Sequence, residues 1–290
     1  MKLIQKALLT YYSSKFRLLA FFSPRKAAKS AFKLFCTPYS RRKTYEAPDV
    51  FKSAEKQSFY FQEHQIHGFH WKPEVPIGHK VLICHGFDSF SYRFERYIRP
   101  LTDQGFEVFA FDAPAHGLST GKTIDALLYR DMILEVARRY GPFSAVIAHS
   151  FGGIAAGLAI EVMESNPPKR LVLIAPATET LRSLNDFCRH LAISRSLKLE
   201  LENLVLHMGG RPLSWYSVAR IIPSISIPTL WLHDKKDKQT PFEDMEHLTR
   251  LSLPHVTFVI TEGLGHSLYR EEKVATQIID FLSTLNTNSN

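Results

Sequence analysis

The 290-residue sequence lacks most patterns that would indicate a covalent or metal-based framework. Its three cysteines, Cys36, Cys84 and Cys188, are odd in number and widely spaced, which predicts neither a disulfide framework nor a zinc site. The sequence contains no H-E-x-x-H, no G-x-G-x-x-G and no Walker pattern. We therefore expect no metal and no organic cofactor, and a reducing, cytoplasmic setting for the thiols.

Long apolar runs are also absent. The amino-terminal runs ALLTYY and LLAFF are interrupted by Lys15 and Arg17, so neither is long enough to span a bilayer. No small-residue cleavage site of a signal peptide follows them, and we expect the segment to be retained.

Acidic residues are missing from the first 45 positions, although these hold eleven of the 36 Lys and Arg residues. The rest of the chain carries 25 basic and 28 acidic residues. This asymmetry favours an anionic surface as a partner, but no recognition motif points to nucleic acid. Apolar residues recur here at helical spacing and predict an amphipathic helix: Leu3, Ala7 and Tyr11 beside Ile4, Leu8 and Tyr12.

Two roles are open for this amino-terminal extension, residues 1–48. In the first, which we favour, the apolar face of the extension packs on the rest of the chain. In the second, residues 1–45 make peripheral contact with the inner surface of an anionic membrane. Residues 49–290 form the main domain in either case.

The main domain alternates between strand and helix patterns. Short apolar strands are expected within 58–71, 80–86, 106–114, 144–150, 170–176, 228–234 and 255–263, with helices between several of them. This alternation predicts an α/β fold with a mostly parallel sheet covered on both faces. Residues 178–224 show only helical patterns, so we expect a helical cap over the carboxyl edge of the sheet, where ligands bind.

The stretch AVIAHSFGG places Ser150 where an apolar strand gives way to a helix of small residues. Ala148 and Gly152, two residues to either side, leave room for a sharp turn. Residues 148–152 resemble the G-x-S-x-G motif of the α/β-hydrolase family, with alanine for the first glycine. The resemblance extends from about Ser58 to Leu285 and implies the α/β-hydrolase fold, with Ser150 as nucleophile.

Two further loops carry the same resemblance. His85-Gly86-Phe87 resembles the family's oxyanion loop, which implies that the backbone N–H groups of Phe87 and Phe151 stabilise the tetrahedral oxyanion. His266 follows a glycine-containing loop after the last strand and resembles the family's catalytic base. The loop from Asp112 to Ser119 resembles a family loop that we take to be structural.

The acid that orients His266 has two candidates. Asp234 ends a strand, whereas Asp237 matches the family pattern H-G-x-x-D-x-x-x-P when His233 and Pro241 serve as anchors. We assign Asp237 as the acid. Asp234 is the alternative acid, and its other possible role is to cap the turn or pair with Lys235 or Lys236.

These residues predict a serine hydrolase that cleaves carboxylic esters of apolar acyl groups through an acyl-enzyme, with a small-molecule ester as substrate. We assign substrate binding to Phe87, His149 and Trp215, the last from a cap rich in apolar residues. Thioesterase, lysophospholipase and C–C hydrolase activities use the same triad. The alternative from a different functional class is a non-catalytic binding scaffold that associates with a membrane.

Overall fold

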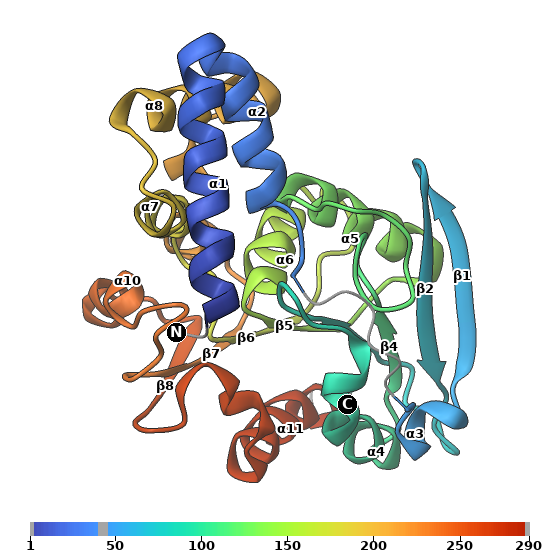
Figure 1. The fold of residues 1–290 in the computed structure, drawn as a ribbon. Helices are drawn as coiled ribbons and strands as arrows, with labels where there is room; N and C mark the ends of the chain where they lie inside the picture. Colours follow the sequence, from blue (N-terminus) through green and yellow to red (C-terminus); the bar gives the residue numbers. More distant parts are fainter. Residues whose placement is uncertain (1–2, 40–45, 288–290) are drawn as a thin grey trace. The chain divides into compact units, whose positions relative to one another are not determined.

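The sheet at the centre of the fold has eight strands within residues 3–39 and 46–287, the part of the chain that this computed structural model describes (Figure 1). Their order is β1-β2-β4-β3-β5-β6-β7-β8. The strands are β1 (Glu55–Phe61), β2 (His64–Trp71), β3 (Lys80–Cys84), β4 (Glu107–Phe111), β5 (Ala145–His149), β6 (Arg170–Ile174), β7 (Thr229–Asp234) and β8 (Val256–Thr261).

Strand directions follow the predicted α/β pattern. β1 pairs antiparallel with β2, and β2 antiparallel with β4, while all the remaining pairs are parallel. The inner parallel strands are mostly apolar, and every residue of β5 and β7 is buried. Such continuous burial is expected of parallel strands with helices on both faces, so the predicted mostly parallel sheet is confirmed.

The described helices connect and cover these strands. The longer ones are α1 (Leu3–Phe22), α2 (Pro24–Phe35), α4 (Glu95–Asp103), α5 (Ala126–Tyr140), α6 (Phe151–Glu161), α7 (Thr180–His190), α8 (Arg195–Gly209) and α11 (Glu272–Thr287). The short helical turns are α3 (Asp49–Lys52), η1 (Ser91–Phe94), η2 (Leu213–Trp215), α9 (Val218–Ile221), η3 (Ile222–Ser224), α10 (Glu243–Glu246), η4 (His247–Arg250) and η5 (Gly265–Arg270).

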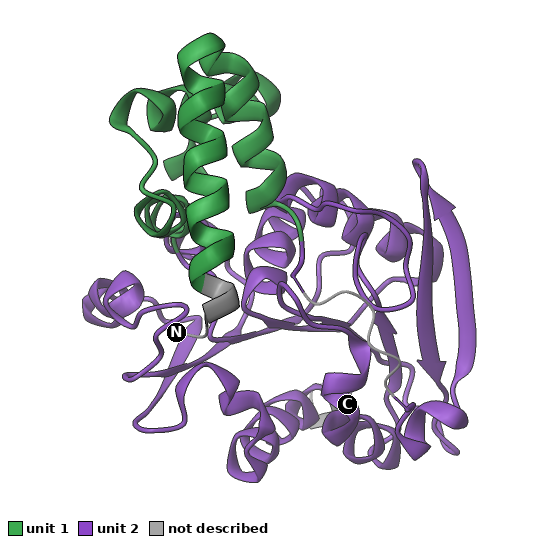
Figure 2. Ribbon diagram, viewed as in Figure 1, with its two compact units in different colours: residues 1–37, 179–217 green, residues 38–178, 218–290 purple. Residues whose placement is uncertain are grey.

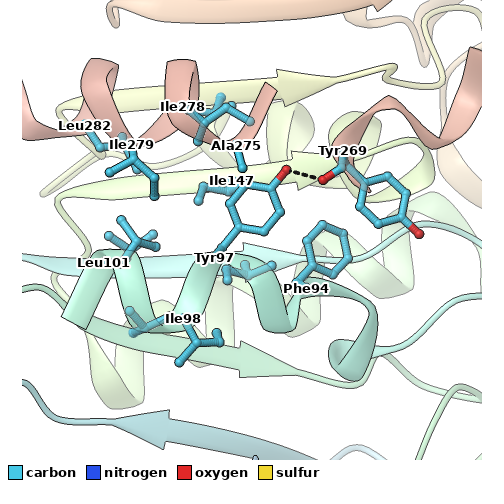
Figure 3. Close-up of a cluster of buried hydrophobic side chains, with 14 of the residues drawn as sticks. Phe94, Tyr97, Ile98, Leu101, Ile147, Tyr269, Ala275, Ile278, Ile279 and Leu282 are labelled. Atoms are coloured by element: carbon cyan, nitrogen blue, oxygen red, sulfur yellow. Dashed lines mark hydrogen bonds between the residues drawn. The ribbon is translucent and has the colours of Figure 1, made fainter. Parts of the chain in front are cut away.

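Helices α4 and α11 cover one face of the sheet, and α5 and α6 cover the other (Figure 1). Figure 3 shows the core under α4 and α11, where Tyr97 is completely buried and its hydroxyl donates to the carbonyl oxygen of Tyr269 at 2.6 Å. This bond satisfies a polar group that would otherwise be costly to bury. It also ties α4 to η5, the turn that carries His266.

The chain divides into two compact units (Figure 2). Unit 1 comprises residues 1–37 and 179–217, and unit 2 comprises residues 38–178 and 218–290. The amino-terminal helices α1 and α2 thus belong with the inserted helices α7 and α8. Residues 218–224, which the sequence analysis included in the cap, belong with the sheet.

Unit 1 has a hydrophobic core of its own. Helix α2 packs on both α1 and α8, and its Ala27, Ala28 and Ala31 are at most 1% exposed. Phe35 of α2 meets Phe187 of α7 with ring centroids 5.3 Å apart. Side chains from both segments complete the core: Phe16, Leu184, Leu191, Leu197, Leu201 and Tyr216.

Some predicted features lie outside the described residues, namely Lys2 and the basic run Arg41-Arg42-Lys43 of the extension and Ser289 of the polar tail. In the part of the chain that is described, none of the helices has the length and apolarity needed to cross a membrane.

Two glycines of α6 provide a matched test of the packing around Ser150. A Cβ at Gly152 would lie 2.5 Å from the carbonyl oxygen of Cys84, whereas a Cβ at Gly157 would make only an ordinary 3.4 Å contact. We expect Gly152→Ala to lower the free energy of unfolding by about 1–3 kcal/mol through overpacking. Gly157→Ala should raise it, by up to about 1 kcal/mol, because alanine favours the helix.

Denaturant titration of both variants measures these changes. Equal effects of the two substitutions would show that α6 does not depend on a close approach at Gly152.

Candidate active site

Ser150 occupies a strained turn between β5 and α6. Its φ of 53° and ψ of −120° fall in a region that residues other than glycine rarely adopt. The backbone N–H of Ser150 donates to the carbonyl oxygen of Ile174 at 3.0 Å, and its carbonyl oxygen accepts from Gly153 and Ala177, each at 2.9 Å. These bonds to β6 and α6 hold the turn and explain how the strain persists.

The residues around Ser150 must be small because α6 begins directly against β3. At Gly152, a side chain would collide with the carbonyl oxygens of Cys84 and His85, at 2.5 and 2.6 Å from its Cβ. Ala148 is completely buried within the sheet. The sequence argument for small residues two positions from the serine therefore has a direct structural basis.

Ser150, His266 and Asp237 come together at the carboxyl ends of their strands. The Nε2 atom of His266 lies 3.0 Å from Ser150 Oγ, and its Nδ1 atom lies 2.8 Å from Asp237 Oδ2. Because an ionised carboxylate only accepts hydrogen bonds, Nδ1 carries the proton and donates it to Asp237. The lone pair of Nε2 then faces the hydroxyl of Ser150, which is the arrangement of a general base and a nucleophile.

The loop after β7 fixes Asp237. Asp237 Oδ1 accepts from the backbone N–H groups of Gln239 and Thr240, at 2.8 and 3.0 Å, and Oδ2 accepts from Thr240 Oγ1 at 2.8 Å. Burial alone would raise the pKa of Asp237, but the hydrogen bonds and charge of His266 and the bonds from Thr240 outweigh it and lower the pKa. Asp237 is therefore ionised at neutral pH.

His233, one of the two residues used to align the family motif, is hydrogen-bonded to this loop. Its Nδ1 accepts from Trp231 Nε1 at 3.3 Å, so its Nε2 carries the proton and donates to the carbonyl oxygen of Thr240 at 2.7 Å. Thr240 is the site residue that the sequence analysis missed. Its position directly before Pro241, the other anchor, was the only available signal.

Asp234 has a different role from Asp237. Its carboxylate accepts from the backbone N–H groups of Lys236, Gly263 and Leu264 and from Thr261 Oγ1, at 2.7–3.2 Å. Burial would raise its pKa, but the hydrogen bonds lower it to about 2. Asp234 thus joins the ends of β7 and β8 and supports the loop that carries His266.

The loop after β3 lies beside the nucleophile. A Cβ at Gly86 would come within 2.9 Å of the Cβ of Ser150, so only glycine fits this approach. His85 Nδ1 lies 2.8 Å from the carbonyl oxygen of Gly86, and His85 Nε2 accepts from the N–H of Ala113 at 2.9 Å. Burial lowers the pKa of His85 to about 4, so its ring is neutral and Nδ1 is the donor.

This bond orients the candidate oxyanion hole. The Gly86 carbonyl and the Phe87 N–H belong to one planar trans peptide and point in opposite directions, so fixing the carbonyl also fixes the N–H. Phe151 is the first residue of α6, and its N–H has no acceptor within the helix. The rings of Phe87 and Phe151 meet edge to face, with centroids 5.6 Å apart.

His149 lies between the site and the core of unit 2. Its ring centroid is 4.8 Å from that of His266, and its Nε2 lies 3.1 Å from the carbonyl oxygen of His266. Burial lowers the pKa of His149 to about 3, so the ring is neutral. Among the described residues its Nδ1 has no hydrogen-bond partner. His149 is 5% exposed. Its assignment to substrate binding remains a prediction.

Asp112 and His116 hold a neighbouring loop. Asp112 accepts from Ser91 and from the N–H of Leu118, while His116 Nε2 accepts from the N–H of Asp88 at 3.0 Å. These bonds match the structural role expected for the loop. No group of three or more His, Cys, Asp or Glu side chains suited to a metal ion occurs within the described ranges.

Trp215, the third residue assigned to substrate binding, lies in η2 of unit 1 and is partly buried beside Tyr216, with ring centroids 5.2 Å apart. Its assignment rests on the sequence alone and stays a prediction.

Comparison with known proteins agrees with the fold. A family model described as the alpha/beta hydrolase family matches residues 81–206, which include Ser150 and both candidate oxyanion residues. The chain has the α/β-hydrolase fold and is similar to this family over these residues, which points to a hydrolase.

Two relatives in sequence are themselves uncharacterized. An abhydrolase domain-containing protein of Dictyostelium discoideum is 27% identical over 165 residues, which are 53% of this chain but only 16% of that protein. YqkD of Bacillus subtilis is 23% identical over 268 residues, covering 86% of this chain and 87% of that protein.

Solved structures share the fold at low sequence identity. Mouse alpha/beta hydrolase domain-containing protein 10 superposes with a TM-score of 0.63 at 16% identity, over 82% of this chain and all of that one. The Pyrococcus furiosus esterase Pf2001 gives 0.60 at 18%, over 86% and 98%. A bacterial membrane phospholipase A gives 0.61 at 19%, over 99% of each chain.

The two aspartates of the β7 loop give a matched pair of variants. In Asp237→Asn the amide can donate to His266, which favours the wrong tautomer, so turnover of an activated ester should fall by about 10²–10⁴-fold in a folded protein. Asp234→Asn should instead lower thermal stability and leave the turnover of the folded fraction within a few-fold of wild type. The opposite ranking would mean that Asp234 orients the histidine.

Proposed function

We propose that this α/β-hydrolase is a serine hydrolase that cleaves carboxylic esters of apolar acyl groups. The proposal rests above all on one observation, the continuous hydrogen-bonded chain from Ser150 Oγ through His266 to Asp237. A serine hydroxyl is a weak nucleophile until an adjacent base takes its proton, and the base must be held in the correct tautomer. In this proposal His266 is the adjacent base, and Asp237 holds it in the correct tautomer.

The reaction begins with attack of Ser150 Oγ on the ester carbonyl carbon while His266 Nε2 takes the hydroxyl proton. Asp237 stabilises the imidazolium that forms. The N–H groups of Phe87 and Phe151 donate to the developing oxyanion, an interaction worth about 3–4 kcal/mol per donor in turnover. His266 then returns the proton to the leaving alkoxide, and the acyl group remains on Ser150.

Deacylation reverses these roles. Water replaces the alcohol, His266 takes its proton, and the carboxylic acid leaves as Ser150 regains its hydrogen. His149 and His85 stay neutral beside this centre because burial lowers their pKa values, so they do not add positive charge next to the transient imidazolium.

The same three catalytic groups also suit the hydrolysis of thioesters, lysophospholipids and activated C–C bonds. Carboxylic esters are our choice, with an apolar acyl group held beside Phe87, whose partly buried ring borders the Gly86 loop. Solved structures of this fold include an esterase of Pyrococcus furiosus and a bacterial membrane phospholipase A, and acyl-ester chemistry agrees with both names. Trp215 of the inserted segment is our candidate for an acyl-selectivity residue.

A fluorophosphonate probe tests the nucleophile directly. The wild-type chain should react, and Ser150→Ala should not, because the hydroxyl of Ser150 lies 3.0 Å from a base that is itself bonded to the carboxylate of Asp237. Ser267→Ala is the matched control, since this exposed serine lies in the loop next to His266, and it should label like wild type.

A panel of acyl esters and thioesters of increasing chain length then distinguishes the substrate classes. Ester turnover that rises with acyl length and falls at least about 10³-fold in Ser150→Ala supports the proposal. No labelling of folded wild-type protein would favour the non-catalytic scaffold, and a preference for thioesters would replace the substrate class while keeping the triad.

A further inference from the structure

The connection between α1 and α2 exposes large apolar side chains in unit 1. Leu18, Phe21 and Phe22 at the end of α1 are 62%, 83% and 76% exposed. Arg25 and Lys26, at the start of α2, are exposed as well. We call these five residues the hairpin tip.

The hairpin tip is not needed for the core of unit 1. Phe16 is 1% exposed and Ala27, Ala28 and Ala31 at most 1%, so a different side of each helix is buried. The exposed face of α1 is nevertheless apolar, because Tyr11, Leu18 and Phe22 recur there at helical spacing and Tyr11 is 58% exposed. A water-facing helix surface is normally polar, and a contiguous apolar patch marks an interaction site.

The local backbone holds the tip in place. The N–H of Ser23 donates to the carbonyl oxygen of Leu19 at 2.8 Å, and Ser23 Oγ caps α2 by accepting from the N–H of Lys26 at 3.4 Å. Pro24 occupies the first turn of α2, where its fixed φ suits a helix start. The two phenylalanines are therefore presented on ordered helix ends and not on a loop.

The amino-terminal segment that carries the tip has charge of one sign. The first 45 residues hold no Asp or Glu, and Arg25, Lys29 and Lys33 form an exposed basic stripe along α2. Their spacing of four residues places them on one side of the helix. The partner of this surface must accept aromatic side chains and also carry negative charge.

We propose that the hairpin tip docks on an anionic lipid bilayer, with Phe21 and Phe22 at the boundary between headgroups and acyl chains and with Arg25 and Lys26 beside lipid phosphates. Aromatic side chains favour this boundary, and basic residues gain from the negative surface potential of anionic lipids. This inference does not depend on the proposed activity, because no tip residue belongs to the triad.

A second copy of the chain is a poorer occupant. A symmetric contact through the tip would bring Arg25 and Lys26 of one copy towards the same residues of the other, and like charges oppose such a contact. The lipid surface satisfies the apolar and the basic residues together.

Co-sedimentation of the full chain with vesicles tests the proposal. Binding to phosphatidylcholine vesicles containing phosphatidylglycerol should exceed binding to pure phosphatidylcholine and weaken with added salt, because salt screens the attraction. Phe21→Ser with Phe22→Ser, and separately Arg25→Glu with Lys26→Glu, should each weaken binding about tenfold or more.

Matched controls come from unit 2. Tyr60 and Val75 are 72% and 77% exposed, so Tyr60→Ser with Val75→Ser removes similar apolar surface elsewhere. Lys56→Glu with Lys122→Glu makes the same charge change at two exposed positions. Both control pairs, and Ser150→Ala, should bind like wild type, and thermal unfolding checks that every variant is folded.

Insertion depth gives an independent readout. Relative to wild type, Phe22→Trp should add a fluorescence signal that shifts to the blue and is quenched by brominated acyl chains on vesicle addition, while the signal added by Tyr60→Trp should show neither change. The proposal is overturned if the phenylalanine pair can be removed without loss of binding, or if neutral and anionic vesicles bind equally. It is also overturned if the chain ignores vesicles and forms a dimer in sedimentation velocity that the phenylalanine variant lacks.

Discussion

The close packing of α6 against β3 is the constraint on which the candidate site depends. Gly152 lets the helix begin where a side chain would meet the Cys84 carbonyl at 2.5 Å, and the chain must turn sharply at Ser150 to do so. The positive φ of Ser150 costs about 1–3 kcal/mol, which the surrounding sheet and helix must offset. In return the serine hydroxyl projects beyond the sheet edge, next to the first N–H of α6 and towards His266.

Burial and hydrogen bonding together determine which side chains around Ser150 are charged and which are neutral. His85 and His149 lie in apolar surroundings that lower their pKa values to about 4 and about 3, so both rings serve as neutral hydrogen-bonding groups. Asp237 is equally buried but receives enough hydrogen bonds to remain ionised. The carboxylate of Asp237 therefore faces His266, whose ring lies within hydrogen-bond distance of the serine hydroxyl.

Much of this site could be predicted from the sequence, because its residues lie in the turns and loops that follow recognisable apolar strands. Ser150, His266 and Phe87 end or follow strands whose pattern is unambiguous, and the spacing between His233 and Pro241 selects Asp237. Thr240 could not be predicted in this way, since a hydroxyl that bridges a carboxylate leaves no periodic signal. The pairing of α2 with α8 was equally hidden, because the small residues Ala27, Ala28 and Ala31 fit many partners.

A crystal structure of the chain after reaction with an organophosphate ester tests the central claim most directly. The account predicts a covalent bond from Ser150 Oγ to phosphorus, with the phosphoryl oxygen about 3 Å from the backbone nitrogens of both Phe87 and Phe151. His266 should remain bonded to Asp237. An adduct on another residue, or a phosphoryl oxygen directed away from these two nitrogens, would contradict the account.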